Sequence, residues 1–205
     1  MYIGKLPFIL KEIIKKHNLL CEYKNVDKSI YLTFDDGPTP DITEWVLEEL
    51  RKYSARATFF VLGKNAIIYP DILKRINEDG HLLGNHTYSH KDGWETNCND
   101  YIKDIELCNN IIHSKFFRPP YGRITPNQVK VLKNAYNIVM WSILSLDYDV
   151  SIDREKYLKK LLYHTKSGSI VVFHDSVKAY NNLRFMLPPF LEFYSYMGYK
   201  FEVLG

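Results

Sequence analysis

Acidic and histidine side chains stand directly after several short apolar segments of this chain. In chain order they are Asp35, Asp36, His86, His90, Asp147 and His174, joined by Arg118. Two histidines and one carboxylate can hold a divalent ion while leaving coordination positions open for water and substrate. A second, adjacent carboxylate and a histidine at the end of another segment are then candidates for a base and an acid. Residues of these types are typical of metal-assisted hydrolysis.

Each of these residues also has a purely structural interpretation. The stretch 35–38, Asp-Asp-Gly-Pro, is rich in ordinary turn residues. His86 and His90 are spaced i, i+4 and would face one way if they lay on a helix, and such a pair is more often incidental than a ligand set. His174 follows an apolar run and fits a buried core histidine equally well, and 118–122 reads as a turn. The chemical interpretation therefore depends on whether the fold brings these residues together.

Short β-branched and aromatic runs alternate with helical patterns along the chain. The runs predict strands at 29–34, 57–62, 82–85, 116–118, 138–141, 170–173 and 199–203. Helices are expected at 6–17, 42–53, 70–79, 101–113, 126–135, 153–165 and 190–197. Thr39 and Thr125 are the expected N-caps of two of these helices, each followed by a proline suited to the first turn. The pair Pro188-Pro189 is expected to start or break a helix rather than lie inside one.

This alternation predicts an α/β fold with a parallel sheet. About seven strand–helix units in one domain fit a closed or nearly closed (β/α) barrel better than an open sheet. We expect residues 29–205 to form that single domain, with residues 1–28 as an extension packing on the barrel. All strand carboxyl ends of such a barrel open on one face. The ionisable residues that follow the strands would then converge on one cleft.

Composition excludes several classes of function. The chain has 205 residues, a net charge of +3 and 46% hydrophobic residues, which fits one globular domain. Its basic residues do not cluster, so nucleic-acid binding is not expected. Three widely spaced cysteines predict neither a disulfide framework nor a thiolate zinc site. No apolar run is long enough for a transmembrane helix or a secretory signal, which leaves the cytoplasm as the default location.

The chain resembles the polysaccharide deacetylases, the NodB-type domain of carbohydrate esterase family four. The resemblance rests on motifs in the family's order, from about residue 29 to the end: Thr33-Phe34-Asp35-Asp36-Gly37-Pro38, His86-Thr87-x-x-His90, Arg118-Pro119-Pro120-Tyr121-Gly122, Asp147 after Trp141, and Val172-Phe173-His174-Asp175. It implies a distorted (β/α) barrel, usually of seven units. It also implies metal-dependent removal of N-acetyl groups from N-acetylglucosamine-type glycans.

The resemblance assigns a role to each motif residue. The implied metal ligands are Asp36, His86 and His90, and the implied catalytic set is Asp35 as base, Arg118 orienting it, His174 as acid, Asp147 tuning that acid, and the Tyr121 backbone N–H stabilising the developing oxyanion. The ligand types suit zinc first, with cobalt or nickel as alternatives. Asp175 follows the acid in sequence and receives no catalytic role.

The fourth motif departs from the family pattern Asp-x-x-Asp-Trp. Leu144 stands where its first Asp would be, and Tyr148 replaces the Trp. Tyr148 keeps an aromatic wall for the acetyl methyl group but adds a hydroxyl. Together with Trp141 and Pro119 it is the expected lining of the substrate pocket. The Tyr148 hydroxyl weakens any substrate assignment taken from chitin- or peptidoglycan-active members of the family.

Two other functions stay open at this point. The same metal hydrolase could act on another amide or on O-acetyl esters, because the metal and acid–base set does not depend on what lies behind the carbonyl. A glycan-binding protein without catalysis is the second alternative, and the intact set of Asp35, Asp36, His86, His90 and His174 argues against it. The glycan partner and the oligomeric state are not defined by the sequence.

Overall fold

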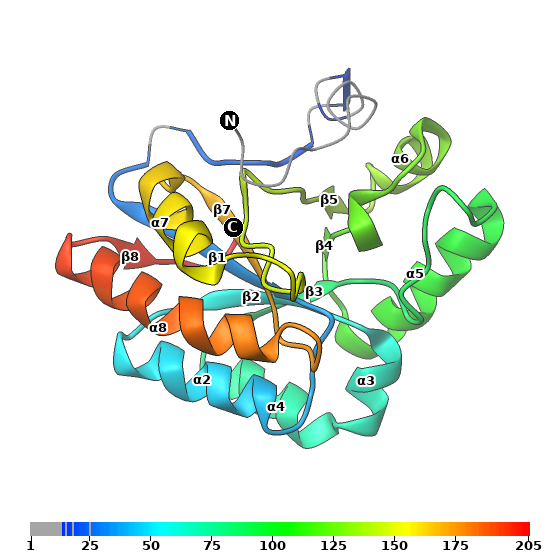
Figure 1. The fold of residues 1–205 in the computed structure, drawn as a ribbon. Helices are drawn as coiled ribbons and strands as arrows, with labels where there is room; N and C mark the ends of the chain where they lie inside the picture. The colour runs from blue at the N-terminus through cyan, green and yellow to red at the C-terminus, as the bar shows by residue number, and fades with distance from the viewer. Residues whose placement is uncertain (1–13, 15, 18, 25) are drawn as a thin grey trace.

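A curled, all-parallel sheet with helices packed around it makes up the fold (Figure 1). The computed structural model describes residues 14, 16, 17, 19–24 and 26–205. The strand order is β5-β4-β3-β2-β1-β7-β6, with β8 paired to the start of β1. The strands are β1 (Ser29–Asp35), β2 (Ala57–Val61), β3 (Leu82–Asn85), β4 (Phe116–Phe117), β5 (Asn137–Ile138), β6 (Ile143–Leu144), β7 (Ile170–His174) and β8 (Lys200–Phe201). The expected distorted (β/α) barrel of about seven units is confirmed.

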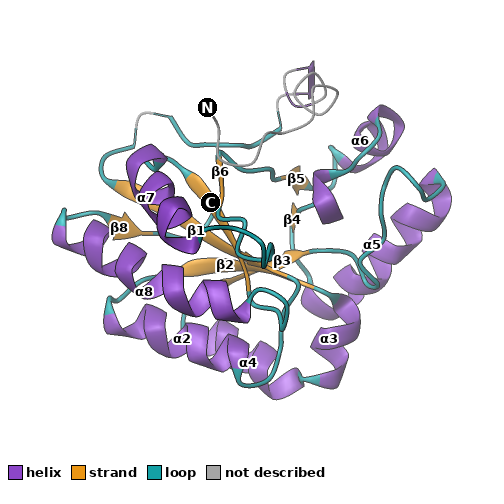
Figure 2. Cartoon of the chain, in the orientation of Figure 1, coloured by secondary structure: helices purple, strands orange, loops and turns teal. Residues whose placement is uncertain are grey.

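Helices lie in most of the connections between successive parallel strands, as crossover connections require, whereas β5 and β6 are joined by the short segment 139–142 without a helix. The helices are α2 (Ile42–Lys52), α3 (Gly63–Ile68), α4 (Pro70–Glu78), α5 (Cys98–Ile112), α6 (Pro126–Leu132), α7 (Arg154–His164) and α8 (Tyr180–Tyr196), with a single 3₁₀ turn at Pro120–Gly122. Figure 2 shows α2, α4 and α8 along one side of the central strands, with α5 and α6 at the other end of the sheet. Among the described residues, no helix combines the length and the apolarity needed to cross a bilayer.

Strand β1 positions the site because its two faces have different partners. Ile30, Leu32 and Phe34 are fully buried in the main core, which they share with residues of α2 and α8. Burying each of these side chains contributes about 1.5–3 kcal/mol. The alternate residues face the inside of the curled sheet, where Thr33 and Asp35 both contact a buried arginine. The strand period of two thus separates the packing face from the chemical face.

Helix α8 contradicts the expectation that Pro188-Pro189 would start or break a helix. Both prolines lie inside α8, which runs from Tyr180 to Tyr196 instead of over 190–197. Leu183, Met186 and Phe190, on the opposite side of this helix from the half-buried prolines, are completely buried in the main core. Their burial offsets the loss of backbone hydrogen bonds at the prolines, which costs about 3 kcal/mol per proline.

Short elements account for most of the other differences. The predicted strand 138–141 is confined to Asn137–Ile138, and the two-residue β6 and the short α3 are not predicted at all. The N-cap of α2 is Asp41 rather than Thr39, and the Asp41 N–H donates to the Glu44 carboxylate at 3.0 Å. Thr125 is confirmed as the N-cap of α6 and accepts a hydrogen bond from Gln128 N.

The described part of the N-terminal segment contacts the chain at the edge strand β5 and again just before β7. Leu20 accepts a hydrogen bond from Met140 N at 2.7 Å, and Tyr23 N donates to the Gly168 carbonyl at 2.8 Å. A Cβ on Gly168, whose φ is +83°, would lie 2.0 Å from the Tyr23 carbonyl oxygen, so this contact requires glycine. The helix expected at 6–17 falls mostly outside the described residues, of which 14, 16 and 17 are helical. The boundary at residue 28 stays a prediction.

Candidate active site

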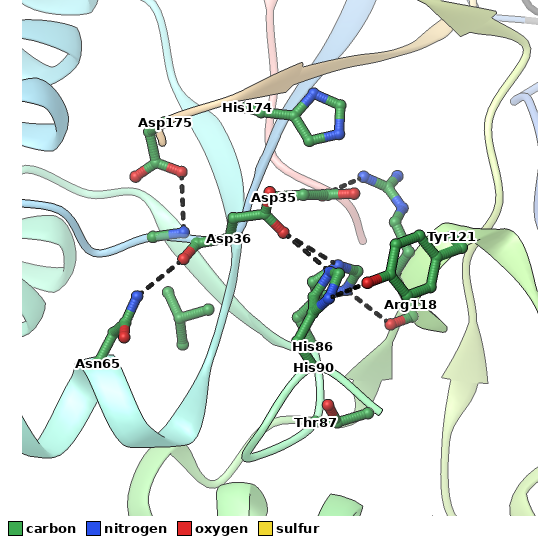
Figure 3. Close-up of polar contacts among 12 residues, drawn as sticks. Asp35, Asp36, Asn65, His86, Thr87, His90, Arg118, Tyr121, His174 and Asp175 are labelled. Carbon is green, nitrogen blue, oxygen red and sulfur yellow. Dashed lines mark hydrogen bonds and ion pairs between the residues drawn. The ribbon is translucent and has the colours of Figure 1, made fainter. Parts of the chain in front are cut away.

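Asp36, His86 and His90 converge at the carboxyl ends of β1 and β3 (Figure 3). The Asp36 Oδ1 atom lies 3.6 Å from His86 Nε2 and 3.2 Å from His90 Nε2. Within the described part of the chain, Oδ1 is buried and receives no hydrogen bond. One ligand atom from each residue lies within 4.8 Å of the other two. A buried oxygen without a donor, facing two imidazole nitrogens, fits a divalent cation.

The pKa shifts of Asp36 and His86 favour their use as metal ligands. Burial favours the neutral form of Asp36, yet His90, His174 and His86 together hold its pKa well below its usual range. Burial lowers the pKa of His86 to about 4, although the aspartates oppose this. His86 Nδ1 donates to the Arg118 carbonyl oxygen at 2.8 Å, so its Nε2 carries the lone pair toward Asp36.

The loop that carries both histidines is not helical, which corrects the i, i+4 helical interpretation of the pair. Thr87 and His90 have φ values of +66° and +61°. The loop is held by Asp104 of α5, whose Oδ1 accepts the N–H groups of Tyr88 and Ser89 at 2.9 Å each. The two imidazoles thus meet through a tight turn anchored from a helix, rather than through helical spacing.

Asp35 is paired with Arg118 inside the barrel. Arg118 is completely buried, and its Nη1 donates to Asp35 Oδ1 at 2.7 Å and to Thr33 Oγ1 at 2.7 Å. Its Nη2 donates to the Met140 carbonyl at 3.0 Å, and its guanidinium lies 4.2 Å from the Phe60 ring centroid. Charge-assisted bonds of this kind fix the direction of a carboxylate. Asp35 is therefore held rigidly beside Asp36.

Asp147 forms two hydrogen bonds with His174 at the end of β7. One carboxylate oxygen accepts from the His174 backbone N–H at 2.8 Å and the other lies 2.7 Å from its Nδ1. Burial alone would lower the pKa of His174, but the completely buried Asp147, helped by Asp36 and Asp35, raises it to about 9. His174 is therefore protonated at neutral pH. The register pairs it directly with Asp35 on β1.

The remaining predicted residues lie at different distances from this centre. Tyr121 has a φ of +58°, and its hydroxyl is 3.1 Å from His90 Nδ1. The ring of Tyr148 meets that of His174 edge-on, with 5.0 Å between centroids. Trp141 packs against a hydrophobic cluster made of Tyr31, Phe60, Val139, Ile170 and Leu204. Pro119 is buried at the start of the 3₁₀ turn.

Asp36, His86 and His90 are called the metal-type cluster below. An open cleft of about 420 Å³ reaches this cluster and is lined by two of its members, Asp36 and His90. The cleft extends between the loop after β1, the start of α3 and the loop after β7. Its other lining residues are Pro38, Thr39, Pro40, Leu62, Lys64, Asn65, Tyr69, Ser176 and Val177. This lining is a mixture of polar and apolar groups and does not include Tyr148, Trp141 or Pro119.

Several polar residues that hold the site were not identified from the sequence. Asp104 lies on the buried face of α5 together with Tyr101, Ile105 and Cys108. A carboxylate on an otherwise apolar helix face is a sequence signal for a buried polar contact. Asn182 of α8 donates to the Asp147 carbonyl at 3.0 Å. Such contacts join residues 15 or more positions apart, so sequence spacing does not reveal them.

Comparison with known proteins finds one family along most of this chain. The model of the family described as polysaccharide deacetylase matches residues 22–137. A peptidoglycan-N-acetylglucosamine deacetylase of Bacillus cereus is 38% identical over 154 residues, which are 72% of this chain and 56% of that protein, so the chain spans just over half of that relative. A chitooligosaccharide deacetylase of Azorhizobium caulinodans is 36% identical over 155 residues, 72% of this chain and 73% of the relative.

The structural likeness extends over nearly the whole chain. A crystal structure of a peptidoglycan N-acetylglucosamine deacetylase, in complex with a naphthyl-substituted N-oxidanyl-benzamide, superposes with a TM-score of 0.86 at 30% identity. It covers 96% of this chain and 95% of the other. The shared architecture therefore includes β6, β7 and α8, which lie beyond the residues matched by the family model.

Proposed function

The chain belongs to the polysaccharide deacetylase family, and we propose that it removes N-acetyl groups from N-acetylglucosamine-type glycans, releasing acetate. One observation carries the proposal: a metal-type cluster, an arginine-bound carboxylate and a protonated histidine stand together at the carboxyl ends of β1, β3 and β7. Relatives described as peptidoglycan and chitooligosaccharide deacetylases support the substrate class.

This family is metal-dependent, and Asp36, His86 and His90 are the residues that would hold the ion. Two imidazoles and a carboxylate suit zinc first, with cobalt or nickel as alternatives. When bound, a divalent ion polarises an acetamide carbonyl and lowers the pKa of a coordinated water to about 7.

Two other side chains, Asp35 and His174, would then accept and donate the protons of the reaction. Asp35 takes a proton from the attacking water, while Arg118 keeps its carboxylate turned toward the site. His174, already protonated, gives a proton to the departing sugar nitrogen. The Tyr121 backbone N–H donates to the carbonyl oxygen as negative charge develops there. Acetate and a free amine result.

The substrate has room on the α3 side of the metal cluster. The cleft there is lined by hydroxyl, amide and ammonium groups that suit the hydroxyls of a sugar ring, including Asn65, Ser176 and Lys64. We place the acetyl methyl group against Tyr148, whose ring borders His174. Trp141 and Pro119 are the other two residues proposed for the acetyl pocket, and neither of them lines the cleft.

Acetate release tests the proposal directly. The protein is stripped with a chelator, reloaded with zinc, cobalt or nickel in turn, and incubated with a soluble N-acetylglucosamine oligomer. We expect acetate release that requires the metal. Release from O-acetylated sugars alone would favour the esterase alternative, because the metal and acid–base set does not depend on what lies behind the carbonyl. Folded, metal-loaded protein that binds the oligomer without releasing acetate would indicate a glycan-binding protein.

Replacing His174 by Asn is expected to lower kcat by about 100- to 10,000-fold, because the proton for the leaving nitrogen is lost. The bound metal is expected to remain, since His174 is not a ligand. Metal content after gel filtration and the initial rate measure the two effects separately. An unchanged rate would remove His174 from the acid role.

The pH profile tests the role of Asp147. The acid form of His174 disappears as the pH rises through about 9, so activity is expected to fall there. Asp147→Asn keeps a hydrogen-bond acceptor but removes the charge, and should move this alkaline limb down by about 1–3 pH units. The folded-state pKa lies above the ordinary 6.5, so the pair stabilises the fold fully below about pH 6.5. That stability is lost as the pH rises through 9. An unshifted limb in the variant contradicts the assignment.

A further inference from the structure

The peptide unit that joins Asp36 to Gly37 is held at both of its polar groups (Figure 3). The Asn65 side-chain amide, from α3, donates to the Asp36 carbonyl oxygen at 3.0 Å. On the other side, the Gly37 N–H donates to Asp175 Oδ1, from the loop after β7, at 3.2 Å. Two elements on opposite sides of β1 thus fix the orientation of one peptide plane.

That plane lies next to an unfavourable backbone conformation. Asp36 has a φ of +82°, in the left-handed region that non-glycine residues rarely adopt. Such a conformation persists only where the surroundings determine it. It is also what turns the Asp36 carboxylate toward His86 and His90, while the preceding Asp35 stays in the strand and points to Arg118. The adjacent aspartates therefore depend on this turn for their different directions.

Asp175 is a completely buried carboxyl group that the proposed mechanism does not use. Its second oxygen, Oδ2, accepts the Thr43 hydroxyl at 2.5 Å, and Thr43 Oγ1 in turn accepts the Thr39 N–H at 2.8 Å. Among the described residues no lysine, arginine or histidine forms an ion pair with it. A buried carboxyl group without a cation is costly. Asp175 ties both ends of the stretch between β1 and α2 to the end of β7.

Gly37 makes this approach sterically feasible. A Cβ at position 37 would lie 2.0 Å from Asp175 Oδ2 and 2.5 Å from its Cγ. The φ of Gly37 is not in the left-handed region, so its backbone conformation does not itself require glycine. The need for glycine comes from the Asp175 side chain.

We propose that Asp175 and Asn65 are positioning residues that hold the Asp36–Gly37 peptide from both sides, so that the Asp36 carboxylate is presented to the metal. The inference rests on the proposed metal site. It gives Asp175 a role through Gly37 and Asp36, without contact with the reacting atoms. It also assigns a function to Asn65 in addition to lining the cleft.

Metal affinity of the full chain, measured by competition with a zinc-binding dye, tests the proposal. Asp175→Ala and Asn65→Ala should each weaken zinc binding by about 10- to 100-fold, as loss of a partner behind a ligand usually does. Asp175→Asn retains an acceptor for the Gly37 N–H and should therefore keep most of the wild-type zinc affinity. Ser114→Ala is the matched control, because it removes a buried side-chain hydrogen bond to the Leu83 carbonyl at the other end of β3.

A purely structural role of Asp175 predicts a different result. Asp175→Ala and Ser114→Ala would then both lower the melting temperature while zinc affinity stayed at the wild-type value, and this outcome would overturn the inference. The inference would also be overturned if Asp175→Asn bound zinc as weakly as Asp175→Ala. If the wild-type chain itself bound no zinc, the proposed function would fail first, so the two failures are distinguishable.

Position 37 offers an independent check. Gly37→Ala should weaken zinc binding because its Cβ displaces Asp175. The double variant Gly37→Ala/Asp175→Ala should bind zinc no more weakly than Asp175→Ala alone, since the obstacle has been removed. Additive losses in the double variant would show that Gly37 acts independently of Asp175, contrary to the proposal.

Discussion

Asp35→Asn is expected to reduce acetate release by about 100- to 10,000-fold or more while leaving the metal bound. The amide keeps the shape of the carboxylate and can still accept a hydrogen bond from Arg118, but it cannot take a proton from water. The metal-type atoms belong to Asp36, His86 and His90, none of which the substitution changes. Initial rates and metal content, measured on the same preparation, check both halves of the prediction.

The same substitution has a second consequence inside the barrel. Arg118 is completely buried, and Asp35 is the carboxylate that balances its charge. Removing one member of a buried pair costs about 3–5 kcal/mol, so the melting temperature should fall. Assays at low temperature, with circular dichroism at that temperature, separate loss of the base from loss of the fold. Glu49→Gln, at a buried acid of α2 outside the site, should retain activity. Loss of metal in Asp35→Asn would overturn the choice of Asp36 as the ligand.

The sequence was sufficient to predict which residues meet, because the geometry of parallel strands brings their ends together. Asp35 and His174 are direct neighbours in the β1–β7 register, and His86 follows β3, two strands from β1. An apolar strand followed by a polar residue is a local pattern, and the barrel converts it into a common site.

The contacts that orient those residues could not be predicted in the same way. Asp104, Asn65 and Asp175 act through backbone groups of distant loops, and backbone groups leave no trace in residue identity. Short elements such as β6 and α3 carry too few residues for a period to be detected. The prolines of α8 show the same limit, because the packing that tolerates them comes from the rest of the core.

Replacing either His86 or His90 by Ala is expected to weaken zinc binding by more than about 100-fold and to abolish acetate release. This loss exceeds the one typical of a residue that only hydrogen-bonds to a ligand. Each imidazole supplies one of three converging lone pairs, and a site with two protein ligands loses both affinity and orientation. The two variants should differ in stability. His86 is buried and donates to the Arg118 carbonyl, so its loss opens a cavity and leaves that carbonyl unpaired. His90 is partly exposed, so its replacement should lower the stability of the fold only slightly.

A matched control separates metal binding from packing at position 86. His81 is also buried, its pKa is also lowered to about 4 by burial, and its Nδ1 accepts the Ala57 N–H, but it lies outside the metal-type cluster. His81→Ala should therefore lose stability like His86→Ala and still bind zinc. If His81→Ala lost zinc equally, the effect at His86 would be one of folding. If His90→Ala retained full zinc affinity, the ion would have to sit elsewhere, because His90 Nε2 is the closer of the two histidine nitrogens to Asp36 Oδ1.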